Sequence, residues 1–416
     1  MIKKNLLLCA SNLSQLDAFL ESTFLENIIK KYNVNFLVNE LDEKYRDRLD
    51  KLSKYGKVFE GFNSKNVSFF YKNFLLIRQK INLFCYYSNE ILKNEDRFKE
   101  NFVVYRTLGV NDPGLIRIFK VLKKFKLLRV LFLLGDIFLR IFSINHLEKD
   151  NLSKNTDMVL ISYKIYDPIG FSDEIIRYCK RKKILSFGIQ INWDSLVFRI
   201  PYQIPNFLGV WGEQSFVFTY SVHKVSPYRI FPIGSLLFDK YMKNNFTKEQ
   251  SREALGLPKG KKIIAICLSD IIYDDIFLVK KINECLNKKI FNDDYYFYFK
   301  GYHGGKNKSL EYAFKNEYNQ KRQKIDFHPN IKFWEPDDCK FEKKKYYQYF
   351  YKAADGVISN FSTMALESLI NSVPTLILNY NPSEYGVNTK GYPFRLFSYH
   401  LYSLRNQEDI YYCNSR

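Results

Sequence analysis

One segment of the chain, residues 354–380 (ADGVISNFSTMALESLINSVPTLILNY), constrains the fold more than any other. The β-branched run at 356–359 is long enough for a buried strand, and another apolar run closes the segment. Between them Ser362 or Thr363 can cap a helix, which Pro374 ends because proline disfavours helical geometry at the preceding residue. The expected apolar side of this helix comprises Met364, Leu366, Leu369 and Ile370. The segment therefore predicts a βαβ unit.

The start of this helix has two interpretations. Free N–H groups and the hydroxyls of Ser362 and Thr363 would form an anion site suited to phosphate, reached through the loop at Asn360. Glu367, one turn further along, is placed to accept hydrogen bonds from ribose hydroxyls. The alternative is an ordinary βαβ unit with a Ser/Thr cap, since caps are common and phosphate sites are rare.

Strands and helices alternate on both sides of a polar stretch at residues 243–250. Such alternation predicts an α/β fold with parallel sheets covered by helices on both faces. We expect two Rossmann-like domains, residues 1–242 and residues 243–416. The first strand is expected to end at Ser11-Asn12, and one helix is expected to follow through about Tyr32.

Residues 68–148 interrupt the alternation and are predicted to be a basic helical insertion in the first domain. Within it, residues 115–144 mix apolar side chains with seven Lys and Arg residues. One interpretation is a basic amphipathic surface that rests on an anionic membrane. The other is a pair of core-packing helices with a solvated lysine face.

The net charge of +20 favours an anionic partner, either nucleic acid, an anionic membrane or a phosphorylated substrate. Nucleic acid is not expected, because the chain has no RNP signature, no zinc-finger spacing and no Arg-rich tail. Seven cysteines without paired spacing indicate reduced thiols. We therefore expect a cytoplasmic protein, with peripheral association at the inner face of the membrane as a further option.

Several motif classes are missing from the sequence. It contains no D-x-D triplet and no metal-ligand spacing, so no metal and no cofactor are expected. It also has no Walker A motif, no G-x-G-x-x-G and no Ser-His-Asp order, so ATPase, dehydrogenase and hydrolase functions lack support.

The S-T-M-A-L-E pattern, followed by a proline and an apolar strand, resembles the donor-nucleotide motif of GT-B glycosyltransferases. Three earlier pieces resemble the end of the acceptor domain in bacterial GT-B enzymes related to surface-polysaccharide and CDP-glycerol-type transferases. They are Trp193-Asp194-Ser195, Val210-Trp211-Gly212-Glu213, and Pro232-Ile233-Gly234 with Phe238-Asp239. The resemblance covers residues 157–400. It implies that an N-terminal acceptor domain and a C-terminal donor-nucleotide domain face each other across a cleft.

The resemblance assigns roles to particular residues. Ser362 and Thr363 would hold the donor diphosphate and Glu367 the ribose, while Gly234 and Ser269 would face the cleft. Just past another strand, Lys300 and His303 could neutralise the departing diphosphate, although His303 could equally lie in an ordinary surface loop.

An acceptor-side base must take the hydroxyl proton if the transfer inverts the sugar. Asp167, Asp194 and Glu213 all follow predicted strands. We prefer Asp194, because Glu213 is also a plausible helix cap.

The sequence therefore predicts a metal-independent glycosyltransferase acting in bacterial surface polysaccharide biosynthesis. Its partners would be a nucleotide-sugar donor and a glycan or lipid-linked acceptor. The alternatives are a polyol-phosphate transferase or a sugar-nucleotide epimerase on the same fold, and a non-catalytic GT-B-like binding module.

Overall fold

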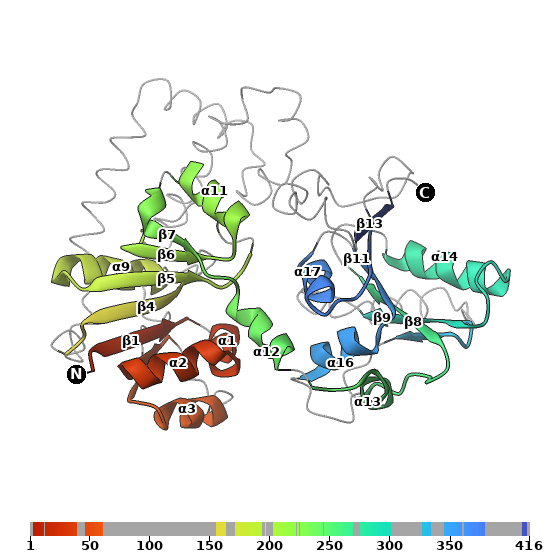
Figure 1. The fold of residues 1–416 in the computed structure, drawn as a ribbon, viewed down its shortest axis with the longest axis horizontal. Helices are drawn as coiled ribbons and strands as arrows, with labels where there is room; N and C mark the ends of the chain where they lie inside the picture. Colours follow the sequence, from red (N-terminus) through yellow and green to blue (C-terminus); the bar gives the residue numbers. More distant parts are fainter. Residues whose placement is uncertain are drawn as a thin grey trace, which may run out of the picture. The chain divides into compact units, whose positions relative to one another are not determined.

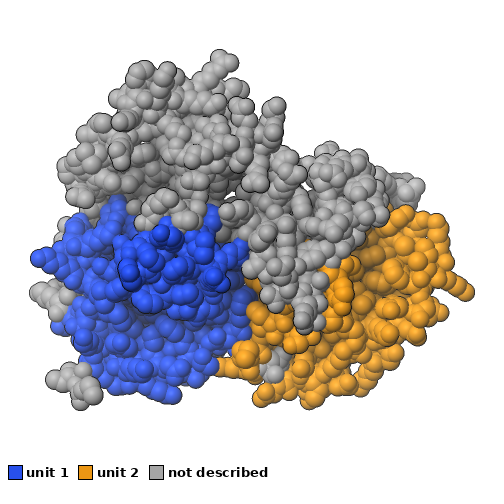
Figure 2. All heavy atoms as spheres, turned by 45° about the horizontal axis from the view of Figure 1, so that its top comes forward, with its two compact units in different colours: residues 1–239 blue, residues 240–416 orange. Residues whose placement is uncertain are grey.

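The chain divides into two compact units, Met1–Asp239 and Lys240–Arg416, each built on a parallel sheet (Figure 1, Figure 2). The computed structural model describes residues 3–11, 13–39, 46–60, 155–163, 171–193, 196, 203–221, 223, 225–243, 245–268, 275–300, 327–333, 345–359, 362–378 and 410–413. The predicted α/β class with two Rossmann-like domains is confirmed by the two sheets. The predicted insertion at 68–148, including the basic segment 115–144, lies outside the described residues.

The sheet of the first unit has the strand order β3-β2-β1-β4-β5-β6-β7 in the described residues. The strands are β1 (Asn5–Ala10), β2 (Asn33–Val38), β3 (Val58–Glu60), β4 (Met158–Tyr163), β5 (Leu185–Gln190), β6 (Phe207–Val210) and β7 (Ile230–Pro232). From β3 to β6 this is the order of the dinucleotide-binding Rossmann fold, whose direction of winding reverses between the first and fourth strands.

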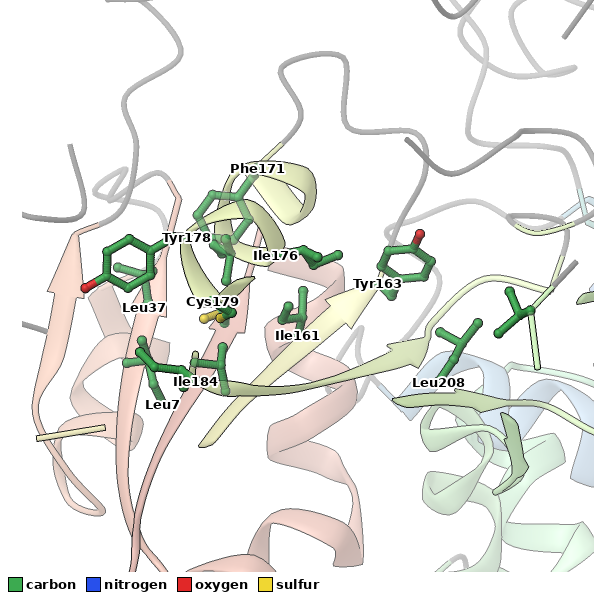
Figure 3. Packing of buried hydrophobic residues seen from close by; sticks show 14 of the residues in the cluster. Leu7, Leu37, Ile161, Tyr163, Phe171, Ile176, Tyr178, Cys179, Ile184 and Leu208 are labelled. Atoms are coloured by element: carbon green, nitrogen blue, oxygen red, sulfur yellow. The ribbon is translucent and has the colours of Figure 1, made fainter. Parts of the chain in front are cut away.

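Helices cover both faces of this sheet, as its two-sided hydrophobic pattern requires. The helices are α1 (Leu13–Glu21), α2 (Thr23–Lys31), α3 (Arg46–Ser53), α9 (Phe171–Lys182) and α11 (Glu213–Ser221). Leu6 and Leu8 of β1 pack in the cluster with α1, α2 and α3, whereas Leu7 and Cys9 pack in the cluster with α9. Figure 3 shows this second cluster, where Cys179 of α9 lies close to Leu7 and Ile184.

The prediction of one helix up to about Tyr32 is wrong, because α1 and α2 are separate helices. Ser22 has extended backbone angles, and its Oγ donates a hydrogen bond to the Phe19 carbonyl oxygen at 2.9 Å. The N–H and hydroxyl of Thr23 both donate to Oδ2 of Asp239, each at 3.0 Å. Asp239, which is the last residue of the first unit, thus binds the start of α2.

The sheet of the second unit repeats the same order, β10-β9-β8-β11-β12-β13, in its described part. The strands are β8 (Lys262–Cys267), β9 (Tyr295–Lys300), β10 (Ile331–Phe333), β11 (Gly356–Ser359), β12 (Thr375–Leu378) and β13 (Ile410–Cys413). Around them lie α13 (Lys248–Ala254), α14 (Asp275–Asn287), α16 (Tyr346–Ala353) and α17 (Thr363–Ile370), and α12 (Asp239–Met242) leads into the unit. Sequence patterns did not predict β13, a four-residue element that pairs with β12.

The apolar side predicted for α17 is not its most buried side. Its fully buried residues are Ala365 and Ser368, while Ile370 is 37% exposed. Ser368 Oγ donates to the Ala365 carbonyl oxygen at 2.8 Å and lies 2.6 Å from Thr375 Oγ1 of β12. These small side chains face the sheet, and they let the helix backbone approach the strands closely.

Local sequence determines both ends of α13. Thr247 and Gln250 form a reciprocal capping box at its start. At its end Gly256 has a φ of +61°, and Leu257 N–H donates to the Arg252 carbonyl oxygen at 2.8 Å. This is the Schellman motif, in which glycine avoids the steric cost of a left-handed backbone. The end of α17 has the same hydrogen bonds but places Ser372 at a φ of +56°.

These two helix ends should respond in opposite directions to substitution. Ser372→Gly should raise the free energy of unfolding by about 1 kcal/mol, because it relieves a left-handed non-glycine residue. Gly256→Ala should lower it by about 1 kcal/mol for the converse reason. Urea denaturation of both variants and the parent chain measures the changes, and shifts of the same sign would contradict the explanation.

Candidate functional site

The carboxyl edge of the second sheet, where its parallel strands end, gathers several polar side chains. Cys267 ends β8, Lys300 ends β9 and Ser359 ends β11. The strand register pairs Cys267 with both Lys300 and Ser359, so these three residues lie side by side. The chain winds in opposite directions from β8 and β11, and open α/β sheets bind ligands at such a point.

Helix α17 begins at this edge with an incomplete cap. Ser362 occupies the N-cap position with extended backbone angles, but its side chain makes no capping hydrogen bond in the described structure. Instead, its Oγ lies 3.1 Å from Oγ of Ser359, and Thr363 is exposed. The first-turn N–H groups are therefore not taken up by the Ser362 side chain, and the positive end of the helix dipole can attract an anion.

Glu367 lies one turn into α17, partly exposed and surrounded by tyrosines and lysines. The hydroxyl of Tyr241, from α12, donates a hydrogen bond to its Oε2. Burial raises the pKa of the Glu367 carboxyl above its ordinary value, although the charges of Lys240 and Lys300 and the Tyr241 hydrogen bond oppose this shift. A carboxylate held in such surroundings is typical of a functional site.

Lys300 is the buried cation of the same cluster, with 6% of its surface exposed. Its Nζ lies 5.1 Å from the centre of the Tyr347 ring on α16. Burial lowers the pKa of Lys300, while Cys267 and Glu367 favour its charged form. Burial also raises the pKa of Cys267 to about 12. The thiol is therefore neutral near pH 7, and Glu367 supplies the negative charge near Lys300.

The structure brings together four of the predicted site residues, namely Ser362, Thr363, Glu367 and Lys300. Gly234 belongs to the first unit, where it has a φ of +79°. Among the proposed bases, Glu213 is the exposed first residue of α11. The other predicted site residues lie outside the described residues: Asp167, Asp194, Ser269, His303 and Asn360.

Sequence reasoning missed the aromatic part of the cluster. Tyr241 meets Glu367 across 126 positions of sequence, and Tyr347 and Tyr351 come from α16. Neither α12 nor α16 carries a motif that marks these tyrosines. The one local signal was the S-T-M-A-L-E start of α17 itself.

The carboxyl edge of the first sheet carries mainly uncharged polar groups in its described part. Gln15 Oε1 accepts hydrogen bonds from the Ser11 N–H, at 2.7 Å, and from the Ser162 hydroxyl. Beyond β5 and β6, Trp193 and Trp211 stack with ring centres 6.2 Å apart and planes at 11°. Gln15, Ser162 and Trp193 are buried, with 0%, 1% and 7% of their surfaces exposed, so these contacts stabilise the edge of the sheet.

The opposite edge of the second sheet contains a structural charge cluster. Asp355, just before β11, accepts hydrogen bonds from Lys248, from Arg252 Nη2 at 2.5 Å and from the Ile263 N–H at 2.6 Å. Partial burial acts to raise the pKa of Asp355, but the hydrogen bonds and positive charges outweigh it, and the pKa is lowered. This cluster joins α13 to two strands and thereby stabilises the unit.

The described residues contain neither a metal cluster nor a membrane span. No group of three or more His, Cys, Asp or Glu side chains lies where it could hold a metal ion. None of the described helices has the length and apolarity needed to cross a membrane.

Comparison with known proteins found similar folds but no relative by sequence. No family model and no curated protein matches the chain. A glycosyltransferase from Rickettsia africae is 12% identical, with a TM-score of 0.49, and the match covers 100% of this chain and 85% of that one. A UDP-GlcNAc 2-epimerase from Methanocaldococcus jannaschii is 12% identical, with a TM-score of 0.48 and coverage of 98% and 94%.

A UDP-GlcNAc 2-epimerase from Neisseria meningitidis, bound to UDP-GlcNAc, is 13% identical, with a TM-score of 0.46 and coverage of 91% and 82%.

The Asp355 cluster predicts a pH-dependent contribution to stability. Because the pKa of Asp355 is lowered on folding, the contribution is present above the unfolded value of about 3.9 and is lost as the pH falls through the folded value. Asp355→Asn should cost about 1–2 kcal/mol at neutral pH, since the cluster is only partly buried. Urea denaturation at a series of pH values should find this difference narrowing below about pH 4. A constant difference would contradict the assignment.

Proposed function

We propose that this protein is a glycosyltransferase that moves a sugar from a nucleotide-sugar donor to a glycan or lipid-linked acceptor in bacterial surface polysaccharide biosynthesis. The observation that carries the proposal is the start of α17. It lacks a side-chain cap, lies at the reversal point of a Rossmann-type sheet, and has a carboxylate one turn away. Phosphate and ribose are the two groups that such a pair of features would bind.

In this proposal the donor nucleotide lies along the carboxyl edge of the second sheet. The N–H groups after Ser362, with the Ser362 and Thr363 hydroxyls, bind the diphosphate, and Glu367 accepts hydrogen bonds from the ribose hydroxyls. Lys300 adds a positive charge beneath the same site. A buried cation and fixed dipoles stabilise the charge that develops on a leaving diphosphate, and such electrostatic stabilisation commonly contributes most to the rate enhancement.

The transfer itself needs an acceptor hydroxyl and a base. The hydroxyl oxygen attacks the anomeric carbon, its proton passes to Asp194, and the electron pair of the breaking carbon–oxygen bond leaves with the nucleotide diphosphate. His303 would assist the departure of that diphosphate. The roles of Asp194 and His303 rest on the sequence motifs.

We place the acceptor on the first unit because the sequence resemblance assigns the acceptor to this domain. Trp193, which is buried beyond the end of β5, immediately precedes the proposed base Asp194. This position supports the proposal that the acceptor hydroxyl lies near the carboxyl edge of the first sheet.

Nucleotide binding tests the donor site directly. Glu367→Ala should weaken binding of the preferred nucleotide by about tenfold, because loss of a hydrogen bond to ribose costs roughly 1–2 kcal/mol. Calorimetry with UDP, CDP, GDP and CMP measures the affinities. Glu253→Ala is the control, since the Glu253 side chain is 70% exposed on α13 and should leave binding unchanged. Equal affinity of Glu367→Ala and the parent chain would exclude Glu367 as a ligand.

Catalysis tests the acceptor side and the reaction class. Asp194→Asn should lower turnover by about 10²–10⁴-fold with donor affinity nearly unchanged, as expected for loss of a general base. EDTA should have little effect, since the sequence lacks a D-x-D triplet. Product analysis separates the alternatives, because an epimerase returns an isomeric nucleotide sugar without transferring it. Activity abolished by EDTA and restored by manganese would contradict the metal-free mechanism.

A further inference from the structure

Tyr241 occupies an unusual place for a buried tyrosine. It lies on α12, at the very start of the second unit, and only 6% of its surface is exposed. The preceding residue, Lys240, is held by a hydrogen bond from Gln348 of α16, whose Nε2 donates to the Lys240 carbonyl oxygen at 2.6 Å. Its ring packs edge-on against Tyr351, with ring centres 5.8 Å apart. The hydroxyl is thereby brought to Oε2 of Glu367.

Packing alone does not account for this arrangement. An apolar side chain in place of Glu367 could fill the same space, and replacing buried polar pairs by apolar groups is often neutral or stabilising. Glu367 is a half-buried residue that lies one turn from an incompletely capped helix start. A carboxylate has about four lone-pair sites, so the hydrogen bonds from Tyr241 and Tyr351 leave acceptor capacity for a ligand.

The groups facing Glu367 come from four other elements. They are Lys240 and Tyr241 on α12, Lys300 on β9, Tyr347 and Tyr351 on α16, and Cys267 on β8. Burial raises the pKa of Glu367, whereas the two lysines and the hydrogen-bonding tyrosines favour its charged form. Removing the Tyr241 hydroxyl takes away one of the groups that keep this carboxyl ionised.

We infer that Tyr241 is a positioning residue for ribose recognition: its hydroxyl holds one oxygen of Glu367 so that the remaining lone pairs accept the ribose hydroxyls. The ligand class is therefore a ribonucleoside diphosphate, discriminated from its 2′-deoxy counterpart through Glu367. This inference rests on the proposed donor site and adds to it a residue that touches the carboxylate and not the nucleotide.

The test compares UDP with 2′-deoxy-UDP in the full chain by calorimetry. The parent chain should prefer UDP. Tyr241→Phe should weaken UDP binding by about tenfold, the effect of losing a hydrogen bond to a charged group, and should weaken 2′-deoxy-UDP binding less. The preference for ribose should therefore shrink. Tyr346→Phe is the matched control, because it removes a buried hydroxyl of α16 whose partner is Tyr298.

A pH series supplies a readout that simple loss of packing would not change. UDP binding should weaken as the pH falls and Glu367 takes up a proton. In Tyr241→Phe this loss should begin at a higher pH, because the ionised carboxyl has lost a hydrogen-bond donor. Glu367→Gln retains an oxygen that can accept the Tyr241 hydrogen bond, but its amide cannot take up a proton. The UDP affinity of this variant should therefore lack the part of the pH dependence that comes from Glu367. The phosphate of UDP also titrates over this pH range, but it does so equally with every variant. The ratio of variant affinity to parent affinity at each pH therefore removes its contribution.

The possible results distinguish failure of the proposed function from failure of the inference about Tyr241. If the parent chain binds none of the ribonucleotides, the proposed function fails and the inference fails with it. If the parent prefers UDP but Tyr241→Phe has the same preference and pH profile, the inference alone is overturned. If Tyr241→Phe does not fold, Glu367→Gln tests the carboxylate that Tyr241 would position, and a pH profile equal to that of the parent would overturn the inference.

Discussion

The parallel pairing of β8 with β11 is the contact on which the candidate site depends. It aligns Ser359 with Cys267, while the pairing of β8 with β9 aligns Cys267 with Lys300. Because the chain winds away in opposite directions from β8 and β11, the two strand ends meet at a point where ligands commonly bind. Helix α17 starts from β11, so this pairing also determines where the first-turn N–H groups of the helix point.

The two edges of the second sheet use charge differently. At the amino edge, Asp355 is bound by Arg252, Lys248 and a backbone N–H, so its carboxylate is stabilised and its pKa is lowered. At the carboxyl edge, burial raises the pKa of Glu367 and lowers that of Lys300. The first arrangement strengthens the fold. The second keeps two ionisable groups at a cost in stability, which is the usual signature of a binding or catalytic site.

The two units share a strand order but differ in the chemistry of their carboxyl edges. The second unit carries a lysine, a carboxylate and serine hydroxyls beside a helix start. The first carries the amide of Gln15, the hydroxyl of Ser162 and a stacked tryptophan pair. A shared backbone plan thus supports different sites, because the strand ends determine where side chains gather and the sequence determines which groups they carry.

Strand–helix alternation determined the α/β class and the two sheets, because parallel strands buried on both faces need that pattern. Local rules also determined the caps of α13 and the start of α17, since these involve residues within one or two turns. Tertiary structure decided the rest. A break at Ser22 separates α1 from α2, and Thr23 after it binds the distant Asp239, while α17 buries the small residues Ala365 and Ser368 against the sheet. The contact of Tyr241 with Glu367 spans 126 positions, so only the folded chain could bring the two residues together.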